Sequence, residues 1–252
     1  MHPVLDALDQ VLDLPRPLNL GKLALPRDGT LAVLAPHPDD FDAIAVTLLQ
    51  FARLGWDIHL AVLTTGVSGV EDGYRGATTA EAKAALREAE QRASCTAFGL
   101  SPENLQFLRL EEDERGHQRD DEANRDCVAS FLTAVQPQCV FMPHGDDSNT
   151  AHRRTWAMFE QVAQRDGLQA WAWLNRDAKT MAMREDIYTL FGAEEAEWKA
   201  RLLRLHDSQQ SRNLRTRGHG FDTRVLEVNR AAAREAGFDG VLVEAFELRR
   251  FG

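Results

Sequence analysis

Cysteine is scarce in this chain, and its few cysteines are widely separated. Cys95, Cys127 and Cys139 are the only ones among 252 residues. Three scattered thiols exclude a fold held together by a disulfide framework, and they exclude a zinc site built from closely spaced cysteines. We therefore expect all three to be reduced residues of the core or of helices.

Basic residues and long hydrophobic runs are also in short supply. The chain has 29 Lys and Arg against 39 Asp and Glu, which gives a formal net charge of −10. This balance argues against nucleic acid or an anionic membrane as a general partner, although a local basic pocket is compatible with it. No run approaches the roughly 18 apolar residues of a membrane span. The N-terminus has no basic, apolar leader and carries Asp6, Asp9 and Asp13. We expect a soluble, cytoplasmic protein without a membrane span.

Glycine patterns that bind nucleotides are missing too. The glycine-bearing segment 64–69 reads Thr-Thr-Gly-Val-Ser-Gly, which contains neither a Walker pattern nor a complete G-x-G-x-x-G. A loop without those patterns is not expected to hold the phosphates of a nucleotide.

The chain does have the composition and the alternation of an α/β domain. Hydrophobic residues make up 44% of it and charged residues 27%, which is ordinary for a globular protein. Strand-like apolar segments alternate with helical ones: strands are expected at 31–35, 56–64, 104–110, 138–142, 168–174 and 241–248, and helices at 43–54, 80–98, 120–135, 153–165, 193–205 and 223–236. This alternation predicts a Rossmann-like three-layer α/β sandwich with a mostly parallel central sheet. We assign residues 1–28 to an N-terminal lead-in and residues 29–252 to a single α/β domain.

The end of the first predicted strand carries the first chemical signal. The apolar run 31–35 is followed at once by His37, Asp39 and Asp40. In open α/β sheets, ligands bind in the crevice beyond the carboxyl ends of the strands. If Pro38 opens a helix, the three-residue spacing brings His37 and Asp40 onto one face, where both can bind a cation while Asp39 holds a water molecule. The alternative is that the Asp pair only caps the helix, whose first turn favours carboxylates.

A second polar cluster, beyond the strand predicted at 138–142, offers a third ligand. Residues 144–152 read His-Gly-Asp-Asp-Ser-Asn-Thr-Ala-His. Because both clusters lie beyond parallel strands, they can face one another across the top of the sheet. A catalytic zinc site has three protein ligands and an open position, and two histidines with one carboxylate meet that need. The same set suits iron or manganese. His152 is the preferred third ligand, and His144 is the competitor.

Two other charged segments have a less specific interpretation. Arg212, Arg215, Arg217 and His219 are expected to form a basic loop. The favoured interpretation is a solvated turn that offsets acidic surroundings, and the alternative is a clasp for an anionic part of a substrate. The charged segment 111–117 is interpreted mainly as a solvated connection.

Short motifs along the chain match one known family. They are Pro36-His-Pro-Asp-Asp40, Thr64-Thr-Gly66, Arg87-Glu-Ala-Glu90 with Phe98-Gly99, Asn149-Thr-Ala-His152, His206-Asp-Ser-Gln209 and Val243-Glu-Ala-Phe246. In content and order they resemble the A-H-P-D-D-E, T-x-G, R-x-x-E, H-P-D-H, H-x-S-Q and A-E-x-F segments of the PIG-L/LmbE family of zinc-dependent deacetylases. The resemblance extends from Leu31 to Leu248 and is specific for the superfamily rather than for a substrate.

The resemblance implies a reaction and a set of site residues. Enzymes of this family remove acetyl from N-acetylglucosaminyl groups, so the implied partner is a small N-acetylated sugar or conjugate that yields acetate and a free amine. By position, His37, Asp40 and His152 are the implied zinc ligands, Asp39 is the implied general base and Arg87 the implied sugar-binding residue. Zn²⁺ is the expected cofactor, with Fe²⁺ or Mn²⁺ as alternatives, and a homo-oligomer stays open.

The sequence departs from the family pattern at two positions. Phe41 stands where the family has Glu, and Asn149 stands where it has the first His of H-P-D-H, which helps to stabilise an oxyanion. An Asn amide can donate a hydrogen bond, and His144 is a second candidate donor. Two other classes of function therefore stay open. One is a metal-dependent phosphoesterase, a class that often uses two metal ions, and the other is a degenerate sugar-binding relative without catalysis.

Overall fold

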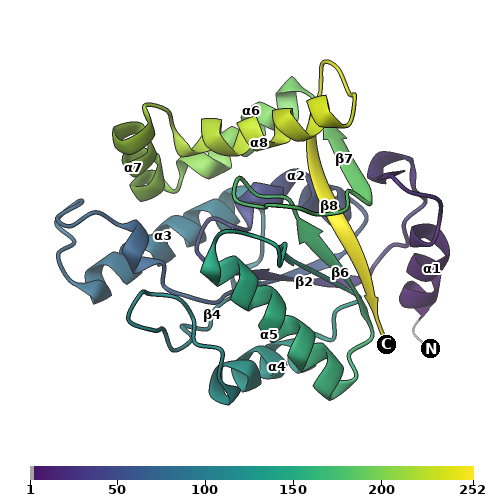
Figure 1. Cartoon of the computed structure of the whole chain (residues 1–252), viewed down its shortest axis with the longest axis horizontal. Helices are drawn as coiled ribbons and strands as arrows, with labels where there is room; N and C mark the ends of the chain where they lie inside the picture. Colours follow the sequence, from purple (N-terminus) through teal and green to yellow (C-terminus); the bar gives the residue numbers. More distant parts are fainter. Residues whose placement is uncertain (1–2) are drawn as a thin grey trace.

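An eight-stranded sheet forms the centre of the computed structural model, which describes residues 3–252 (Figure 1). The strand order is β1-β7-β8-β6-β5-β2-β3-β4. The strands are β1 (Leu18–Asn19), β2 (Thr30–Ala35), β3 (Asp57–Val62), β4 (Leu105–Phe107), β5 (Cys139–Pro143), β6 (Ala170–Asn175), β7 (Ile187–Phe191) and β8 (Leu242–Phe251). β8 runs antiparallel to its neighbours β6 and β7, and the remaining pairs are parallel.

Helices cover both faces of this sheet. They are α1 (Pro3–Leu12), α2 (Ala45–Arg53), α3 (Ala80–Phe98), α4 (Glu122–Val135), α5 (Thr150–Asp166), α6 (Ala193–Arg204), α7 (Asp207–Arg217) and α8 (Phe221–Glu235). On one face, Leu31 and Val33 of β2 pack with α1, α2 and α3, and on the other Ala32 and Leu34 pack with α4 and α5. Strands buried on both faces need apolar side chains in both directions, which explains their continuous apolar runs. The predicted Rossmann-like three-layer sandwich is confirmed.

Helix α3 shows how local sequence sets the element boundaries. The Thr79 hydroxyl caps its N-terminus by accepting a hydrogen bond from the backbone N–H of Ala82. Gly99 ends it in the left-handed conformation, with φ of 95°, which glycine adopts without a steric penalty. The helix covers the residues predicted from the sequence.

Residues 3–28 pack against the sheet and contribute a strand to it. Leu5, Leu8 and Leu12 of α1 belong to the main apolar cluster, and β1 pairs in parallel with β7 at the edge of the sheet. No helix among the described residues is long and apolar enough to cross a bilayer.

The predicted basic loop is a helix, so that expectation was wrong. Arg212, Arg215 and Arg217 all lie on α7, and only His219 follows it. The segment has little apolar content because its inward side is polar: Ser208 and Asn213 are buried on α7. The backbone N–H and the hydroxyl of Ser208 both donate to Glu90 of α3, at 2.7 Å. A helix attached through polar contacts has no hydrophobic period to reveal it.

Candidate active site

The candidate site lies where the order of strands in the sheet reverses. From β2 the chain continues outward through β3 and β4, and it then returns to the other side of β2 with β5. The loops that leave β2 and β5 therefore separate and leave a crevice between them, which is the usual place for a ligand in this class of fold. A cavity of about 660 Å³ occupies this position.

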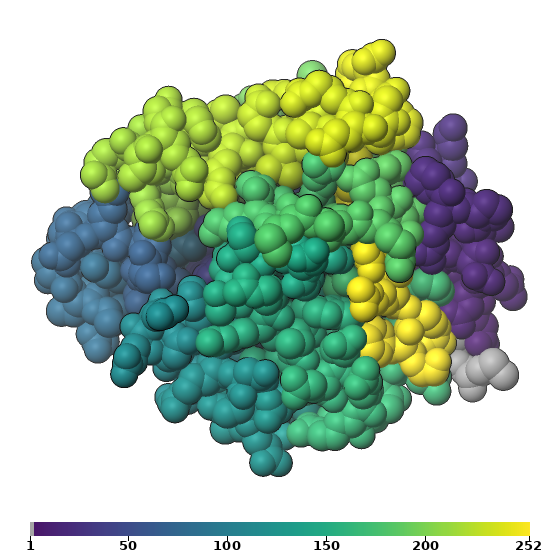
Figure 2. Space-filling view, viewed as in Figure 1, coloured from purple at the N-terminus to yellow at the C-terminus, as the bar shows by residue number. Residues whose placement is uncertain are grey.

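The cavity lies between the strand ends and the C-terminal helices. It is lined by residues of the loops after β2, β3, β4, β5 and β6, and of helices α3, α5, α7 and α8. In the space-filling view, the yellow-green surface of α7 and α8 lies over the blue and green surfaces of the preceding segments (Figure 2). The C-terminal helices thus form one wall of the cavity.

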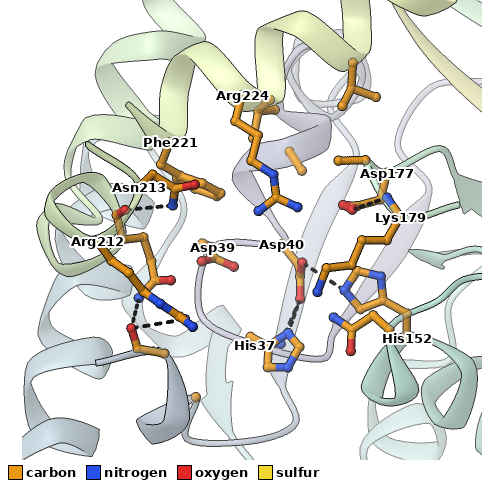
Figure 3. A pocket seen from close by; sticks show the side chains of 18 of the residues that line it. His37, Asp39, Asp40, His152, Asp177, Lys179, Arg212, Asn213, Phe221 and Arg224 are labelled. Atoms are coloured by element: carbon orange, nitrogen blue, oxygen red, sulfur yellow. Dashed lines mark hydrogen bonds and ion pairs between the residues drawn. The ribbon is translucent and has the colours of Figure 1, made fainter. Parts of the chain in front are cut away.

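Three predicted metal ligands converge in the cavity. The ligand atoms of His37, Asp40 and His152 lie within 4.8 Å of one another. His37 Nδ1 is 3.2 Å from Asp40 Oδ2, and His152 Nε2 is 3.7 Å from Asp40 Oδ1. Figure 3 shows both imidazoles next to the Asp40 carboxylate, with His37 below it and His152 to its right.

The geometry that joins His37 to Asp40 is a turn and not the helix predicted from their spacing. α2 begins only at Ala45, after a 3₁₀ turn over Asp42–Ile44. The Asp40 carboxylate instead accepts a hydrogen bond of 2.8 Å from the backbone N–H of His37. Asp39, between them, has φ of 118°, a conformation that L-residues rarely adopt. Strained backbone of this kind persists only where surrounding contacts hold it, and it is concentrated at functional sites.

A buried carboxylate orients His152, the third predicted ligand. Asp147 Oδ2 is 3.0 Å from His152 Nδ1, and Asp147 is fully buried. With Nδ1 held by this partner, Nε2 of His152 is the nitrogen that faces Asp40. A carboxylate behind a histidine ligand is the usual arrangement in metal sites, where it fixes the tautomer and the orientation of the ring. Asp147 was absent from the predicted site because its role depends on its distance from His152.

The ligand set is electrostatically coupled. Burial raises the pKa of Asp40, but the hydrogen bond from His37 and the charge of His152 outweigh it and hold that pKa well below its usual range. Burial lowers the pKa of His152, but the hydrogen bond to Asp147 and the charge of Asp40 outweigh it and raise that pKa to about 9. The site therefore concentrates negative charge that a proton or a cation can neutralise.

The donor set fits a single divalent cation. Two imidazoles and a carboxylate, with one imidazole backed by a second carboxylate, match the ligands of a catalytic zinc site. A second group, Asp147, His152 and Asp177, shares His152 with the first. Among residues 3–252, no metal-binding group of His, Cys, Asp or Glu is independent of His152. Burial raises the pKa of Asp177, which was not part of the predicted site.

Arg87 lies in the cavity wall, beside Asp39. Its Nη2 is 3.0 Å from Asp39 Oδ2, and its side chain is 2% exposed. The same guanidinium donates to the carbonyl oxygen of Pro38 and lies 3.7 Å from Glu90. Gly66 leaves room for it, because a Cβ on Gly66 would lie 3.3 Å from Arg87 Nε. The contact of Arg87 with Glu90, three residues along the same helix, is therefore buried and does not form a surface ion pair.

The two predicted hydrogen-bond donors, Asn149 and His144, lie in different surroundings. Asn149 lines the cavity, and its Oδ1 caps α5 by accepting from the backbone N–H of Ala151 at 3.1 Å. His144 is not brought to the cavity: its Nε2 is 3.2 Å from Glu247, and its Nδ1 accepts from the backbone N–H of Asp146. Both ring nitrogens of His144 are thus engaged in the protein interior.

His117 is a cavity residue that the sequence did not indicate. It belongs to the charged segment interpreted as a solvated connection, yet it lines the cavity with His37 and Asn149. Its Nδ1 is buried and has no hydrogen-bond partner among the described residues. Burial lowers the pKa of His117 and so favours the neutral form of its imidazole.

Asp42 supplies a buried carboxylate one position after Phe41, the residue that stands where the family has Glu. Phe41 packs edge-on against Phe98 in the core, with ring centroids 5.0 Å apart. Asp42 is fully buried and accepts a hydrogen bond of 2.5 Å from the Ser94 hydroxyl. It also lies 2.6 Å from His206 Nε2, at the start of the His206-Asp-Ser-Gln209 segment. This buried pair joins the loop after β2 to the start of α7.

Solved structures with the same fold include several deacetylases. They include the N,N'-diacetylchitobiose deacetylase from Pyrococcus horikoshii, with 17% identity, 88% of this chain and 84% of that chain covered, and a TM-score of 0.71. Teicoplanin deacetylase Orf2 has 14% identity, 88% and 98% coverage, and a TM-score of 0.64. The 4-carboxy-2-hydroxymuconate hydratase GalB from Pseudomonas putida KT2440 has 19% identity, 88% and 95% coverage, and a TM-score of 0.65. At these identities the likeness demonstrates a common fold.

Family comparison agrees with the motifs. No curated protein matches the sequence. The model of the family described as PIG-L, GlcNAc-PI de-N-acetylase, matches residues 32–163, a stretch that contains His37, Asp40, Arg87 and His152. Because this match extends over more than half of the chain and the sheet and helices agree with deacetylase structures, the protein belongs to the PIG-L family.

Proposed function

We propose that this protein is a metal-dependent N-deacetylase that hydrolyses the acetamide of an N-acetylglucosamine-type small molecule and releases acetate and a free amine. The observation that carries the proposal is the convergence of His37, Asp40 and His152 beside Asp39, in a cavity at the reversal point of the sheet. Membership of the PIG-L family supports the same reaction.

His37, Asp40 and His152 would hold the cation, with Asp147 holding His152 in orientation. Zn²⁺ is the expected ion, and Fe²⁺ or Mn²⁺ suits the same donors. When bound, such a cation makes a water molecule acidic enough to ionise near neutral pH and polarises a carbonyl group.

Asp39 is the proposed general base. It lines the cavity next to the ligand Asp40, and it is not part of the ligand set. Its carboxylate would take a proton from the attacking water and return it to the nitrogen of the leaving amine. Arg87 holds this carboxylate in place through its hydrogen bond to Oδ2. We assign Arg87 primarily to positioning Asp39, next to the substrate-binding role that the family resemblance implies.

Asn149 is the proposed donor to the developing oxyanion. Its carbonyl end is engaged in capping α5, so the amide N–H₂ is the end available to the cavity. A donor that faces the charge formed in the transition state stabilises it without reorganisation. His117 is the second candidate, because a neutral imidazole carries one N–H and it lines the same cavity. His144, with both ring nitrogens engaged elsewhere, is the weaker candidate.

The decisive experiment is release of acetate by the purified, metal-loaded protein from a panel of N-acetylated sugars. Acetate must be measured directly, since a neighbour of the same fold is a hydratase and fold alone does not determine the reaction. We expect the wild type to release acetate from at least one N-acetyl sugar, and we expect the Asp39→Asn variant to lose this activity.

The alternatives predict different metal contents. One ion per chain is expected here, two ions per chain with hydrolysis of a phosphate ester would favour the phosphoesterase, and a protein that binds sugar without ion or turnover would favour the degenerate binder. Within residues 3–252, both candidate ligand groups include His152, which supports a single ion.

A further inference from the structure

The cavity concentrates positive charge in an acidic protein. Its lining includes six basic side chains and three carboxylates: Arg87, Arg176, Lys179, Arg212, Arg217 and Arg224 against Asp39, Asp40 and Asp177. The chain as a whole carries a formal net charge of −10. Basic side chains therefore outnumber carboxylates in the lining although the whole protein is acidic, and a cleft with excess positive charge attracts anionic ligands.

Two of these basic side chains are neutralised inside the protein. Arg87 lies 3.0 Å from Asp39, and Arg176 lies 2.6 Å from both Glu185 and Glu235. Their charges are therefore already matched by the fold.

The other four basic side chains lack such partners. No carboxylate within residues 3–252 lies within 4.0 Å of Lys179, Arg212, Arg217 or Arg224. Arg212 reaches only the carbonyl oxygen of Gly69, at 3.5 Å. These four come from two sides of the cavity, with Lys179 after β6 and the arginines on α7 and α8.

Arg224 is the most informative of the four. It lies on the first turn of α8 and is half-buried, and its guanidinium makes no hydrogen bond to any described residue. Figure 3 shows it extending from α8 into the space above Asp39 and Asp40. A guanidinium that is partly removed from water without a partner is unfavourable in the free protein. Because the Arg224 guanidinium points into the cavity, a ligand bound there would supply the missing partner.

We propose that the substrate carries an anionic group, a phosphate or a carboxylate, and that Arg224 binds this group with help from Arg217 and Lys179. The planar guanidinium of arginine binds either group through two parallel hydrogen bonds. The inference rests on the proposed deacetylase function, and it specifies that the N-acetylated substrate is acidic rather than a neutral sugar. Neutral hydroxyl groups would give the Arg224 guanidinium no anionic partner at ion-pair distance.

The test is a binding measurement with metal-loaded protein and three amine probes that represent deacetylated products. Glucosamine is the reference without an anionic group, glucosamine 6-phosphate adds a phosphate, and muramic acid adds a carboxylate. At least one acidic probe should bind about tenfold or more tightly than glucosamine, the equivalent of one good charge-assisted contact. Arg224→Gln should remove that preference without changing metal content.

A matched control lies on the same helix. Arg230 of α8 pairs with Glu227 at 2.7 Å and is outside the cavity, so Arg230→Gln should keep the preference of the wild type. Equal affinities for the three probes in the wild type would overturn the inference. A preference that persists in Arg224→Gln would also overturn it, because the anion would then bind without Arg224.

Acetate release separates this inference from the function on which it rests. If N-acetylglucosamine is hydrolysed as efficiently as its 6-phosphate and N-acetylmuramic acid, the deacetylase function stands and the anionic subsite is wrong. If the acidic probes bind through Arg224 but no N-acetylated compound releases acetate, the subsite stands and the deacetylase function is wrong.

Discussion

The guanidinium of Arg87 lies 3.0 Å from the carboxylate of Asp39, and both side chains line the cavity. Arg87 is on α3, whereas Asp39 is on the loop after β2, so the contact joins two segments that are 48 residues apart. The two side chains are 2% and 12% exposed. A residue expected to bind sugar thus also supports the proposed general base.

Removing Arg87 should destabilise the protein. Arg87→Ala leaves Asp39 and Glu90 without their cation, and breaking a buried ion pair by removing one partner typically costs about 3–5 kcal/mol. Urea unfolding would measure the loss. Arg92→Ala on the same helix is the control: Arg92 is 56% exposed and pairs with Glu88, so a loss of about 1 kcal/mol or less is expected. Similar losses in both variants would show that the Arg87 pair contributes no more than a surface pair.

Asp39→Asn should separate catalysis from metal binding. The amide keeps the shape of the side chain but cannot accept a proton from water, so turnover should fall by roughly 10²–10⁴-fold. Metal content should stay at the wild-type value, because Asp39 is not in the ligand set. Wild-type turnover in this variant would remove Asp39 from the mechanism, and loss of the ion would make it a ligand.

Two buried histidines of the same segment should differ in their effect on metal content. His152→Ala removes a ligand atom, and elemental analysis should find most of the ion lost. His144→Ala should retain the ion, because the ring of His144 contacts Glu247 and Asp146 instead of the ligand set. If His152→Ala kept its full metal content and His144→Ala lost the ion, then His144 rather than His152 would be the ligand.

Metal affinity should increase with pH. In the metal-free protein the pKa of His152 is raised to about 9, chiefly through Asp147 and Asp40 against the opposing effect of burial. The imidazole must lose its proton to bind a cation, so below pH 9 each unit of acidification should weaken binding by up to about tenfold. Titrations of metal-free protein with Zn²⁺ between pH 6 and pH 8 would measure this slope. A dissociation constant that does not change over that range would contradict the coupling.

The sequence by itself determined the fold class and the kinds of residue at the strand ends. Strands buried on both faces require continuous apolar runs, so 31–35 was recognisable without any tertiary information, and β2 contains it. Local signals also set α3, since its cap at Thr79 and its end at Gly99 depend only on neighbouring residues. His37 and Asp40 could be proposed as partners because they are close along the chain.

Tertiary structure alone decided how the remaining polar side chains are paired. Asp147 reaches His152, Arg87 reaches Asp39, and His144 turns toward Glu247, and no sequence spacing distinguishes these outcomes. The same holds for α7, whose attachment through Ser208 and Glu90 leaves no hydrophobic period. Apolar burial leaves a periodic record in the sequence because it depends on which side of an element a residue occupies. A hydrogen bond or ion pair between distant segments depends on angstrom-scale distances that exist only after the chain has folded.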